Sequence, residues 1–374
     1  MFRKFIVISM VFEEDIFKKI KSNSVQLSAF LLDWFDENKR ELPFRKNRSL
    51  YSIWVSEVML QQTKVDTVIP YFNSWMKKFP NIKFVAEASE ESILKSWEGL
   101  GYYSRCRNFH KAAKIIVNDY GSKIPEDWDN FRSLPGVGDY TAGAVLSIAL
   151  NKNYLAIDGN VKRVVSRITR RKNLSKYNLN YIRSFLSKNI DINRTGDFNE
   201  AIMELGACIC LPRLPKCRQC PLNSFCAGYK SGTPSNYPQK SVIKKVPVRT
   251  FVGGIIRFKN RILIQKRDSH MLNGLWEIPM KQITLNINYT EDFKKYIFDK
   301  YGYVISFKKI ISEVEHVYSH FKMKLIVMDF IISDDVKNSG NSSSWIFKKD
   351  IDRYAFHRAN HKVFKLFKNF NWDV

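Results

Sequence analysis

Four cysteines with short spacing constrain the fold of this chain more than any other feature. They form the pattern Cys210-x6-Cys217-x2-Cys220-x5-Cys226, which places four thiol groups in one compact loop. Such a loop suits a four-iron, four-sulfur cluster, and spacing alone leaves a zinc site open as the alternative. Five of the six cysteines lie within 19 positions, which is typical of a metal or cluster site and unlike a secreted disulfide framework.

The length and charge of the chain set the number of domains and the class of partner. Its 374 residues are enough for two or three domains. Lys and Arg total 61 against 36 Asp and Glu, a net charge of +25, while 45% of the residues are hydrophobic. This composition fits a folded protein that binds polyanions better than a disordered basic tail. The charge is most concentrated in residues 151–230, where 15 basic and 5 acidic side chains leave +10.

The start of the chain predicts no membrane span. Its apolar run covers residues 5–12, far short of the roughly 18 residues that cross a bilayer. We therefore expect a monomeric cytoplasmic protein with no membrane partner. Residues 1–24 are treated as an N-terminal extension without an assigned role.

A change in the spacing of apolar residues predicts the domain organisation. Residues 25–230 carry apolar side chains at helical spacing and predict an all-α domain that includes the four-cysteine loop. Residues 231–250 are rich in Gly, Ser, Pro and Lys, contain no acidic residue, and predict a basic linker. Residues 251–374 predict an α+β domain. Its expected elements are strands at 251–258, 261–266, 314–321 and 324–332, and a helix at 291–301.

Two glycines in a short string point to contact with a phosphate backbone. The string LPGVGDYTA runs from Leu134 to Ala142 and leads into a predicted helix. Gly136 and Gly138 let the chain turn tightly and approach another molecule, and the free N–H groups at the start of the next helix can hold a phosphate. A second string, AIDGNVKR, spans 156–163.

These strings and the cysteine spacing resemble the helix-hairpin-helix glycosylase superfamily with an iron-sulfur loop. The strings WVSEVMLQQT at 54–63 and GLGYY at 99–103 narrow the resemblance to adenine-DNA glycosylases of the MutY type, which remove adenine mispaired with 8-oxoguanine. It is dense over residues 25–230 and looser over residues 251–374. The resemblance implies one [4Fe-4S] cluster, double-stranded DNA with A:8-oxoguanine or A:G mispairs as partner, and a nucleoid location if the protein is bacterial.

Removal of adenine requires two carboxyl groups in different environments. The base must be protonated to leave, and the sugar cation needs nearby negative charge. Glu57 lies in an apolar helical run, where burial raises a carboxyl pKa. The resemblance implies that Glu57 protonates adenine and activates water. Asp158 can be read as the N-cap of the following helix, and the resemblance implies that it stabilises the sugar cation.

The residue at position 140 separates two types of glycosylase. Members of this superfamily that also cut the backbone carry Lys there, whose amine forms a Schiff base with the sugar. Tyr140 cannot do so, and we expect a monofunctional enzyme. The resemblance implies that Tyr140 and Asn160 orient Asp158 and the sugar. Lys162 is expected to contact a phosphate.

An adenine turned out of the duplex leaves a gap that side chains must fill. The resemblance places Gln62 and Tyr102 beside the opposing 8-oxoguanine, although Tyr102 can also be read as a half-buried core aromatic. The string Leu42-Pro43-Phe44-Arg45 matches an LPW pattern near the adenine pocket, and Arg45 is expected to bind DNA. Phe44 stands where Trp is usual, which keeps the apolar face and loses an N–H donor.

The string GLWEIP at 274–279 resembles the start of a Nudix domain. Nudix hydrolases bind magnesium through a glutamate-rich helix, and residues 280–303 contain no REUxEE string, so we expect a Nudix-like fold without hydrolase activity. The family reads 8-oxoguanine with a Phe-Ser-His loop. Here the loop is Tyr318-Ser319-His320, so Ser319 and His320 are expected to contact the lesion.

Three other functions share parts of this pattern. A bifunctional endonuclease III-like glycosylase and lyase has the same fold, but the absence of Lys at position 140 and the second domain argue against it. A non-enzymatic DNA-binding iron-sulfur protein would not need Glu57 and Asp158 together. A Nudix pyrophosphatase would need the glutamates that residues 280–303 lack.

Overall fold

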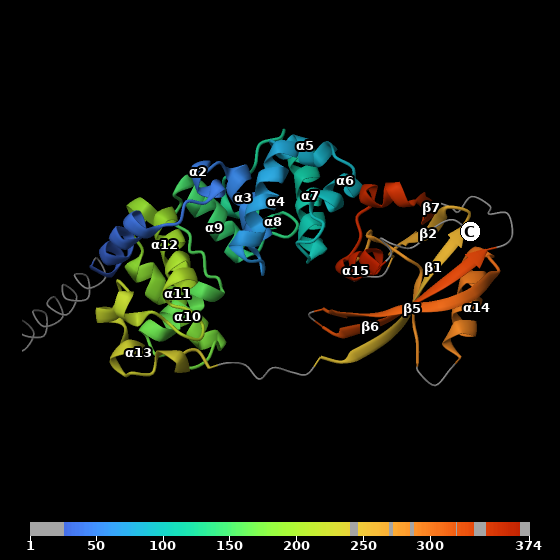
Figure 1. Ribbon diagram of the computed structural model, residues 1–374. Coiled ribbons are helices and arrows are strands. Elements are labelled where there is room, and N and C mark those ends of the chain that lie inside the picture. The colour runs from blue at the N-terminus through green and yellow to red at the C-terminus, as the bar shows by residue number, and fades with distance from the viewer. Residues whose placement is uncertain are drawn as a thin grey trace, which may run out of the picture. The chain divides into compact units, whose positions relative to one another are not determined.

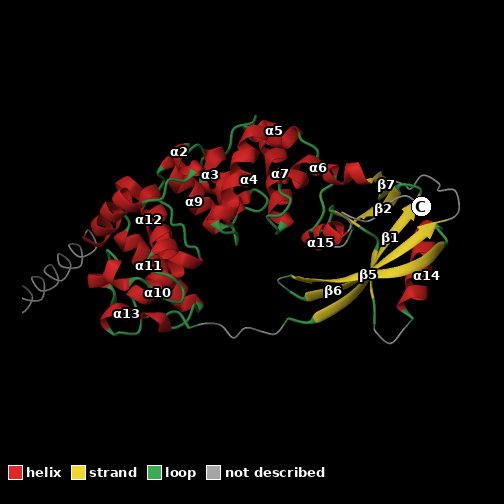
Figure 2. Ribbon diagram, in the orientation of Figure 1, coloured by secondary structure: helices red, strands yellow, loops and turns green. Residues whose placement is uncertain are grey.

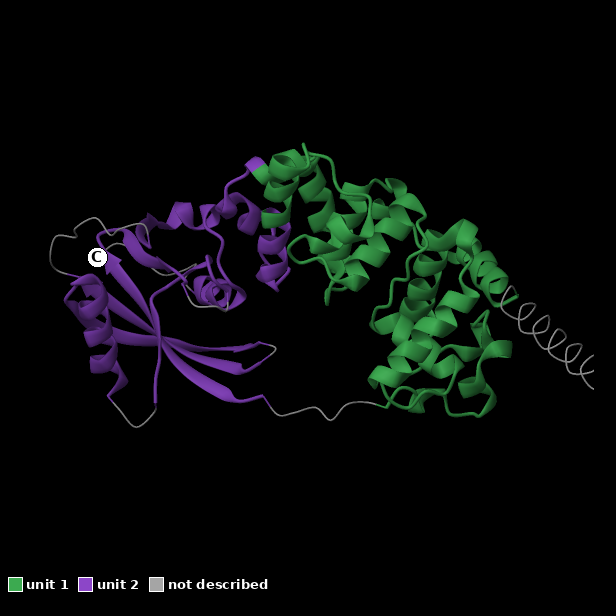
Figure 3. Cartoon of the chain, turned by 180° about the vertical axis from the view of Figure 1, so that it is seen from behind, with its two compact units in different colours: residues 1–86, 111–241 green, residues 87–110, 242–374 purple. Residues whose placement is uncertain are grey.

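The computed structural model describes residues 26–239, 246–268, 272–284, 288–318, 320–332 and 342–366, so the extension at 1–24 lies outside the described residues. The chain forms two compact units, Met1–Ala86 with Lys111–Ser241 and Glu87–His110 with Val242–Val374 (Figure 3). The described part of the first unit is helical, and the second combines a sheet with helices, as predicted (Figure 2). The segment 87–110, which the sequence assigned to the glycosylase domain, packs with the second unit.

The first unit begins with a helix at 26–38 and continues through a series of short and medium helices (Figure 1). In chain order these are α2 Pro43–Lys46, α3 Leu50–Leu60, α4 Val65–Lys78, α5 Ile82–Glu87, α8 Trp128–Ser133, α9 Asp139–Leu150, α10 Gly159–Ile168, α11 Lys176–Asn189, α12 Thr195–Cys208 and α13 Ala227–Lys230. Two further helices from this part of the sequence include residues of the second unit. Helix α6 Glu90–Ser96 lies within the second unit, and α7 Tyr103–Asp119 has residues in both units. Short 3-10 turns occupy Ile192–Arg194, Cys217–Gln219, Asn223–Phe225 and Pro234–Asn236.

Helix α3 lies in the interior of the first unit. It packs on α4 and α9, and α9 also packs on α12, which contacts α10. Nine consecutive residues of α3, 51–59, are buried, which fits a helix that is apolar nearly all round. The hydroxyl of Ser49 accepts the N–H of Ser52 and so caps the start of α3. The interior position carries Glu57 into the core of the unit.

The Gly-rich string forms the predicted tight turn between two helices. Gly136 has a φ of +82°, a left-handed conformation that favours glycine, and Gly138 is the N-cap residue of α9. Because Gly138 has no side chain, it forms no capping hydrogen bond with the first backbone N–H groups of α9.

The second unit contains a sheet with strand order β3-β2-β1-β6-β5, in which β4 pairs with β1 and β7 with β2. Strands β1 and β6 are parallel, whereas the other pairs are antiparallel. Alternate residues of β1 face opposite sides, since Ile255 packs in a cluster with Val363 of α15 and Ile256 in a cluster with Phe293 of α14. The elements are β1 Val248–Phe258, β2 Arg261–Lys266, β3 Trp276–Glu277, β4 Met280–Gln282, α14 Tyr289–Tyr301, β5 Ile305–Val317, β6 Lys322–Ile332, β7 Ser343–Phe347, the 3-10 turn Lys348–Arg353 and α15 Arg358–Leu366.

Two expected segments, a strand and the linker, differ clearly from the structure in their bounds. The strand expected at 314–321 is β5 at Ile305–Val317, because the Tyr318 N–H bonds the carbonyl of Phe321 and closes a turn there. The linker expected at 231–250 is shorter at both ends. Tyr237 is buried, its carbonyl accepts from Arg167, and β1 already begins at Val248. No helix in the described ranges is long and apolar enough to cross a membrane.

Candidate active site

Glu57 is a buried carboxyl group with a raised pKa. The Tyr140 hydroxyl donates a hydrogen bond to Glu57 Oε2 at 2.6 Å, and Met203 Sδ lies 3.5 Å from the same hydroxyl. Burial raises the pKa of Glu57 to about 7, against the lowering effect of the Tyr140 hydrogen bond and with a smaller contribution from negatively charged Asp158. The apolar run around Glu57 in the sequence thus has the expected electrostatic effect.

Asp158 is held at the start of α10 by two donors. Its Oδ1 accepts the N–H of Val161 at 2.7 Å, and its Oδ2 accepts from Asn160 Nδ2 at 2.9 Å. Asn160 in turn accepts from Arg163 Nη2 at 2.9 Å. Burial is the larger effect and raises the pKa of Asp158 above its ordinary value, while these hydrogen bonds favour the ionised form and act in the opposite direction. Asp158 is therefore an N-cap residue and a fixed carboxyl group at once.

One pocket of the first unit collects these groups from helices that are distant in the sequence. Asn160 contacts Asp158 directly, whereas the described hydrogen bonds of the Tyr140 hydroxyl reach Glu57 and Met203 rather than Asp158. Phe44 also lines the pocket and packs edge-on against Phe72. The polar groups in the pocket wall include Arg40, Arg45, Ser56, Glu57, Tyr140, Asp158, Asn160, Glu200 and Glu204.

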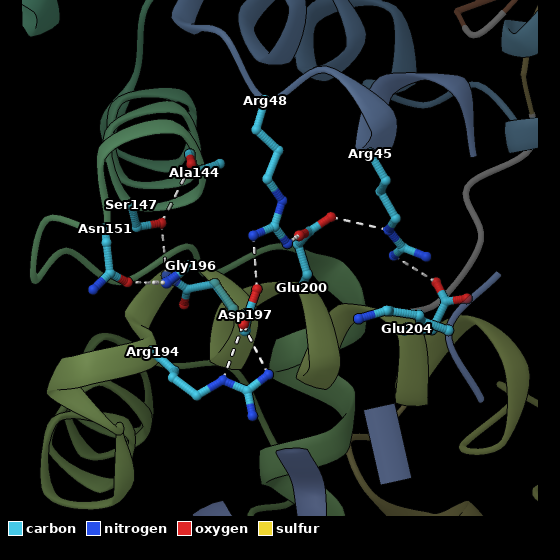
Figure 4. A network of polar contacts seen from close by, with 12 residues as sticks. Arg45, Arg48, Ala144, Ser147, Asn151, Arg194, Gly196, Asp197, Glu200 and Glu204 are labelled. Carbon is cyan, nitrogen blue, oxygen red and sulfur yellow. Dashed lines mark hydrogen bonds and ion pairs between the residues drawn. The ribbon is translucent and has the colours of Figure 1, made fainter. Parts of the chain in front are cut away.

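Two glutamates of α12, Glu200 and Glu204, belong to this wall and were not foreseen from the sequence (Figure 4). Arg45 Nε donates to Glu200 at 2.9 Å, and its Nη2 donates to Glu204 at 3.0 Å. Burial alone raises the pKa of Glu204, but hydrogen bonds from Arg40 and Arg45 bring it down to about 2. The sequence shows this pair only as two glutamates at i, i+4 spacing. Such pairs are more often found on solvated helix faces, so the spacing alone does not indicate a pocket wall. Arg45 thus lies within an ion-pair network of the pocket wall rather than on an open surface.

The network continues toward the amino end of α12. Arg48 bonds both Asp197, at 2.8 Å, and Glu200, and Arg194 bonds Asp197 from the other side at 2.8 Å (Figure 4). Acidic and basic side chains therefore alternate along the contact between the 40–48 segment and α12. This arrangement fixes the orientation of the glutamates that line the pocket.

The residues expected to enter DNA share an unusual backbone conformation. Gln62 has a φ of +58° and Tyr102 a φ of +48°, in the left-handed region that non-glycine residues rarely adopt. Gln62 is exposed, and the side chain of Tyr102 is 42% exposed, so Tyr102 is not a core aromatic. Strained, exposed residues of this kind are frequent at binding sites.

A groove of the first unit lies beside the Gly-rich turn. Lys162 and Arg183 line it together with Asp139 and Tyr140. Lys162 therefore lies next to the start of α9, where the turn from Gly136 to Gly138 leaves helix N–H groups open. Cations and helix N–H groups together suit a phosphate backbone.

The four cysteines of the sequence pattern line a single cavity with apolar neighbours. No three His, Cys, Asp or Glu side chains in the described ranges gather as closely as one metal ion would need. Arg167 is buried at their edge, and its Nη1 donates to Cys210 Sγ at 3.3 Å. Its other bonds go to backbone carbonyls of Cys210, Leu211, Pro212 and Tyr237. A buried cation among neutral carbonyls is well matched to an anionic sulfur-ligated group, so these residues fit such a group.

The predicted lesion loop lies between β5 and β6. Ser319 falls outside the described residues, and His320 is exposed. Tyr318 packs against the core of its domain, and its hydroxyl lies 3.2 Å from Nδ1 of the buried His357. His357 Nε2 lies 3.2 Å from a carboxylate oxygen of Glu277, which is also buried. Tyr318 is thus directed into the domain, while His320 is available to a ligand.

Comparison with known proteins agrees with this architecture. Residues 55–184 match the HhH-GPD superfamily of base excision DNA repair proteins, and residues 251–366 match the NUDIX domain. A solved structure of a thermostable thymine-DNA glycosylase superposes with a TM-score of 0.52 at 27% identity, covering 57% of this chain and 98% of that chain. A trapped endonuclease III–DNA intermediate superposes with a TM-score of 0.50 at 22% identity, covering 57% of this chain and 98% of that chain, which shows a shared fold. The chain is therefore an HhH-GPD base excision repair protein with an added NUDIX domain.

Curated relatives define the family more narrowly. The adenine DNA glycosylase of Buchnera aphidicola subsp. Schizaphis graminum is 34% identical over 91% of this chain and 98% of its own length. That of Homo sapiens is 30% identical over 92% of this chain and 74% of its own length. The chain belongs to the adenine DNA glycosylase family.

Proposed function

We propose that this protein hydrolyses the N-glycosidic bond of adenine paired with 8-oxoguanine or guanine in double-stranded DNA, without cutting the backbone. The observation that carries the proposal is the pairing of two unlike carboxyl groups in one pocket. Glu57 has a pKa of about 7, and Asp158 is held by two hydrogen-bond donors that favour its charged form. Two such groups are what departure of a purine from its sugar requires.

Glu57 would act as the general acid. With its pKa near neutrality it holds a proton in a substantial share of molecules at pH 7 and can pass it to a ring nitrogen of adenine. Protonation turns the base into a neutral leaving group as the bond to the sugar breaks. The Tyr140 hydrogen bond fixes the carboxyl group in place during this step. Once deprotonated, Glu57 can accept a proton from the attacking water.

Asp158 would stabilise the positive charge that develops on the sugar. Its carboxylate is immobilised by Val161 and Asn160, so little reorganisation is needed when the cation forms. Tyr140 occupies the position where a lyase has an amine, which supports hydrolysis without a Schiff-base intermediate.

The proposed DNA contacts divide into positioning and recognition. Gly136, Gly138 and Lys162 would hold the phosphate backbone, and Arg45 would contact the extruded base through the pocket wall that it helps to form. Gln62 and Tyr102 would fill the vacated space, and His320 with Ser319 would contact 8-oxoguanine. All of these roles extend the family resemblance to residues of this chain.

The proposed cofactor is one [4Fe-4S] cluster held by Cys210, Cys217, Cys220 and Cys226. The cysteines share a cavity, and the buried charge of Arg167 at Cys210 would balance part of the cluster's negative charge. When bound, the cluster would supply a rigid anchor for its basic loop rather than a chemical step in base removal. The spectrum of protein purified without air distinguishes this cluster from zinc, since zinc thiolates have no visible absorption.

A single-turnover assay tests the function. Duplexes carrying A opposite 8-oxoguanine or guanine should acquire an alkali-labile site on the adenine strand, without strand cleavage before alkali treatment. Duplexes carrying A opposite T serve as the control. If neither mispair yields alkali-labile sites, the proposed activity is wrong, and cleavage before alkali would favour the bifunctional lyase.

A further inference from the structure

The turn that carries Tyr102 is held by residues far along the chain. Within the second compact unit, Arg358 Nη2 donates to the backbone carbonyl of Gly99 at 2.6 Å. The carboxylate of Glu98 accepts the backbone N–H of Phe356 at 2.7 Å and lies 2.9 Å from Nε2 of His361. Phe356, Arg358 and His361 all lie at or near the start of α15. The C-terminal segment therefore contacts two consecutive residues, Glu98 just ahead of the turn and Gly99 at its start.

The hydrogen bonds to Glu98 are strongest when its carboxyl group is negatively charged, and the pKa of Glu98 meets that condition. Burial alone raises its pKa, but hydrogen bonds from His361, Lys95 and the Phe356 N–H lower it below the ordinary value of a glutamate. Its carboxylate is therefore ionised at neutral pH. Lys95 also donates to the carbonyl of Tyr354 at 3.0 Å, so α6 and the segment before α15 are bonded at neighbouring points.

The turn has a backbone shape that depends on such support. Gly99 has a φ of +97°, Gly101 of +74° and Tyr102 of +48°, and the left-handed conformation is unfavourable for a residue with a Cβ. On its local side, Trp97 Nε1 and Arg105 Nη2 each donate to the Gly101 carbonyl at 3.1 Å. The Arg105 guanidinium also lies 5.4 Å from the centre of the Tyr102 ring. Local bonds hold both ends of the turn, since the Gly99 N–H also donates to the Tyr103 hydroxyl at 3.1 Å. Arg358 and Glu98 add bonds from the C-terminal segment at its beginning.

We propose that Glu98 and Arg358 are positioning residues through which the C-terminal domain holds the Gly99–Tyr102 turn in the shape that inserts Tyr102 into DNA. This inference rests on the proposed function, because it takes Tyr102 as a residue that enters the duplex. The C-terminal domain then has two tasks on DNA. It contacts the base opposite adenine, and it supports the residue that fills the gap when adenine leaves.

Hydrogen exchange in the free protein tests the positioning without any reference to catalysis. Arg358→Ala should speed exchange of the amides of residues 99–103 about tenfold, the effect expected for loss of one hydrogen bond from a charged donor. Arg358→Lys keeps a donor and should restore part of the protection. Arg353→Ala is the matched control, because it removes the same charge from a side chain that is 78% exposed. Unchanged exchange in Arg358→Ala would overturn the proposal.

A double-mutant cycle tests the link to Tyr102. Arg358→Ala should lower the single-turnover excision rate about tenfold in the native chain and less than about twofold when Tyr102 is already Ala, because both changes disable the same insertion. Glu98→Gln, which keeps the shape of the side chain, should follow the same pattern and serves if Arg358→Ala does not fold. Losses that multiply in the double variant would contradict the inference. A wild-type protein without excision would refute the proposed function, while the exchange result would still decide whether the turn is held.

Discussion

The hydroxyl of Tyr140 donates to Glu57 Oε2 at 2.6 Å and thereby joins α9 to α3 inside the pocket. This bond and the burial of the carboxyl group act in opposite directions. Burial raises the pKa of Glu57, the Tyr140 donor lowers it, and the balance is a pKa of about 7. The acid strength of Glu57 therefore depends in part on a residue that comes from the Gly-rich string, 83 positions along the chain.

Replacement of Tyr140 by Phe should shift the decline of the excision rate to higher pH. In the proposed mechanism the protonated form of Glu57 is the active one, so the wild-type rate should fall as pH rises through about 7. Without the donor the pKa of Glu57 rises, and the decline should begin at higher pH. Loss of the hydrogen bond should also lower the maximal single-turnover rate about tenfold. A variant with the full rate and an unshifted profile would remove Tyr140 from the mechanism.

Replacement of either carboxyl group should separate catalysis from DNA binding. Asp158→Asn keeps a good N-cap residue at the start of α10, so the fold should be preserved while the sugar cation loses its stabilising charge. Glu57→Gln keeps an oxygen that can accept from Tyr140 and removes the proton donor. Each variant should lose about 10²-fold or more in single-turnover rate and retain affinity for the mispaired duplex. Catalysis that survives both changes would favour a different assignment of the site.

The Glu204 ion pairs should make the pocket wall sensitive to acid. The folded-state pKa of Glu204 is about 2, below its value in an unfolded chain, so its contribution is present above about pH 4.5 and is lost as pH falls toward 2. The difference corresponds to about 3 kcal/mol at neutral pH. Glu204→Gln should lower the free energy of unfolding by a similar amount and flatten its acid dependence, as measured by denaturant titration at several pH values. Asp352→Asn, at an exposed side chain of the second unit, is the control.

Much of the fold and part of the site could be predicted from the sequence, for identifiable reasons. The all-α and α+β units follow from the two spacings of apolar residues, and the turn at Gly136 follows from the need for a left-handed residue. Glu57 and Asp158 could be singled out from the sequence because each lies in a distinctive local string. The expected consequence for Glu57, a raised pKa, depends only on burial in an apolar helix, which the same string predicts.

Other features depend on contacts between distant segments, which local patterns do not encode. Glu200 and Glu204 resemble an ordinary helix surface until Arg45, some 155 positions earlier, is placed beside them. The assignment of residues 87–110 to the second unit likewise rests on side chains such as Glu98, whose partner Phe356 is 258 positions away. The family resemblance predicted a role for Tyr102 in DNA but gave no sign of what holds its turn.

Salt and two single replacements should separate general DNA binding from recognition of the lesion. Because the chain carries a net charge of +25, the logarithm of its DNA affinity should fall linearly with the logarithm of salt concentration. Lys162→Ala removes one proposed phosphate contact, so it should weaken binding to all duplexes alike and reduce the slope by about one. His320→Ala should leave the slope unchanged and reduce the preference for 8-oxoguanine over guanine, because its exposed side chain lies in the predicted lesion loop and is not proposed to contact the DNA phosphate backbone. Binding measured across a salt series with the three proteins checks both statements. Loss of lesion preference at salt concentrations that leave general binding intact would show that recognition itself depends on screened charges.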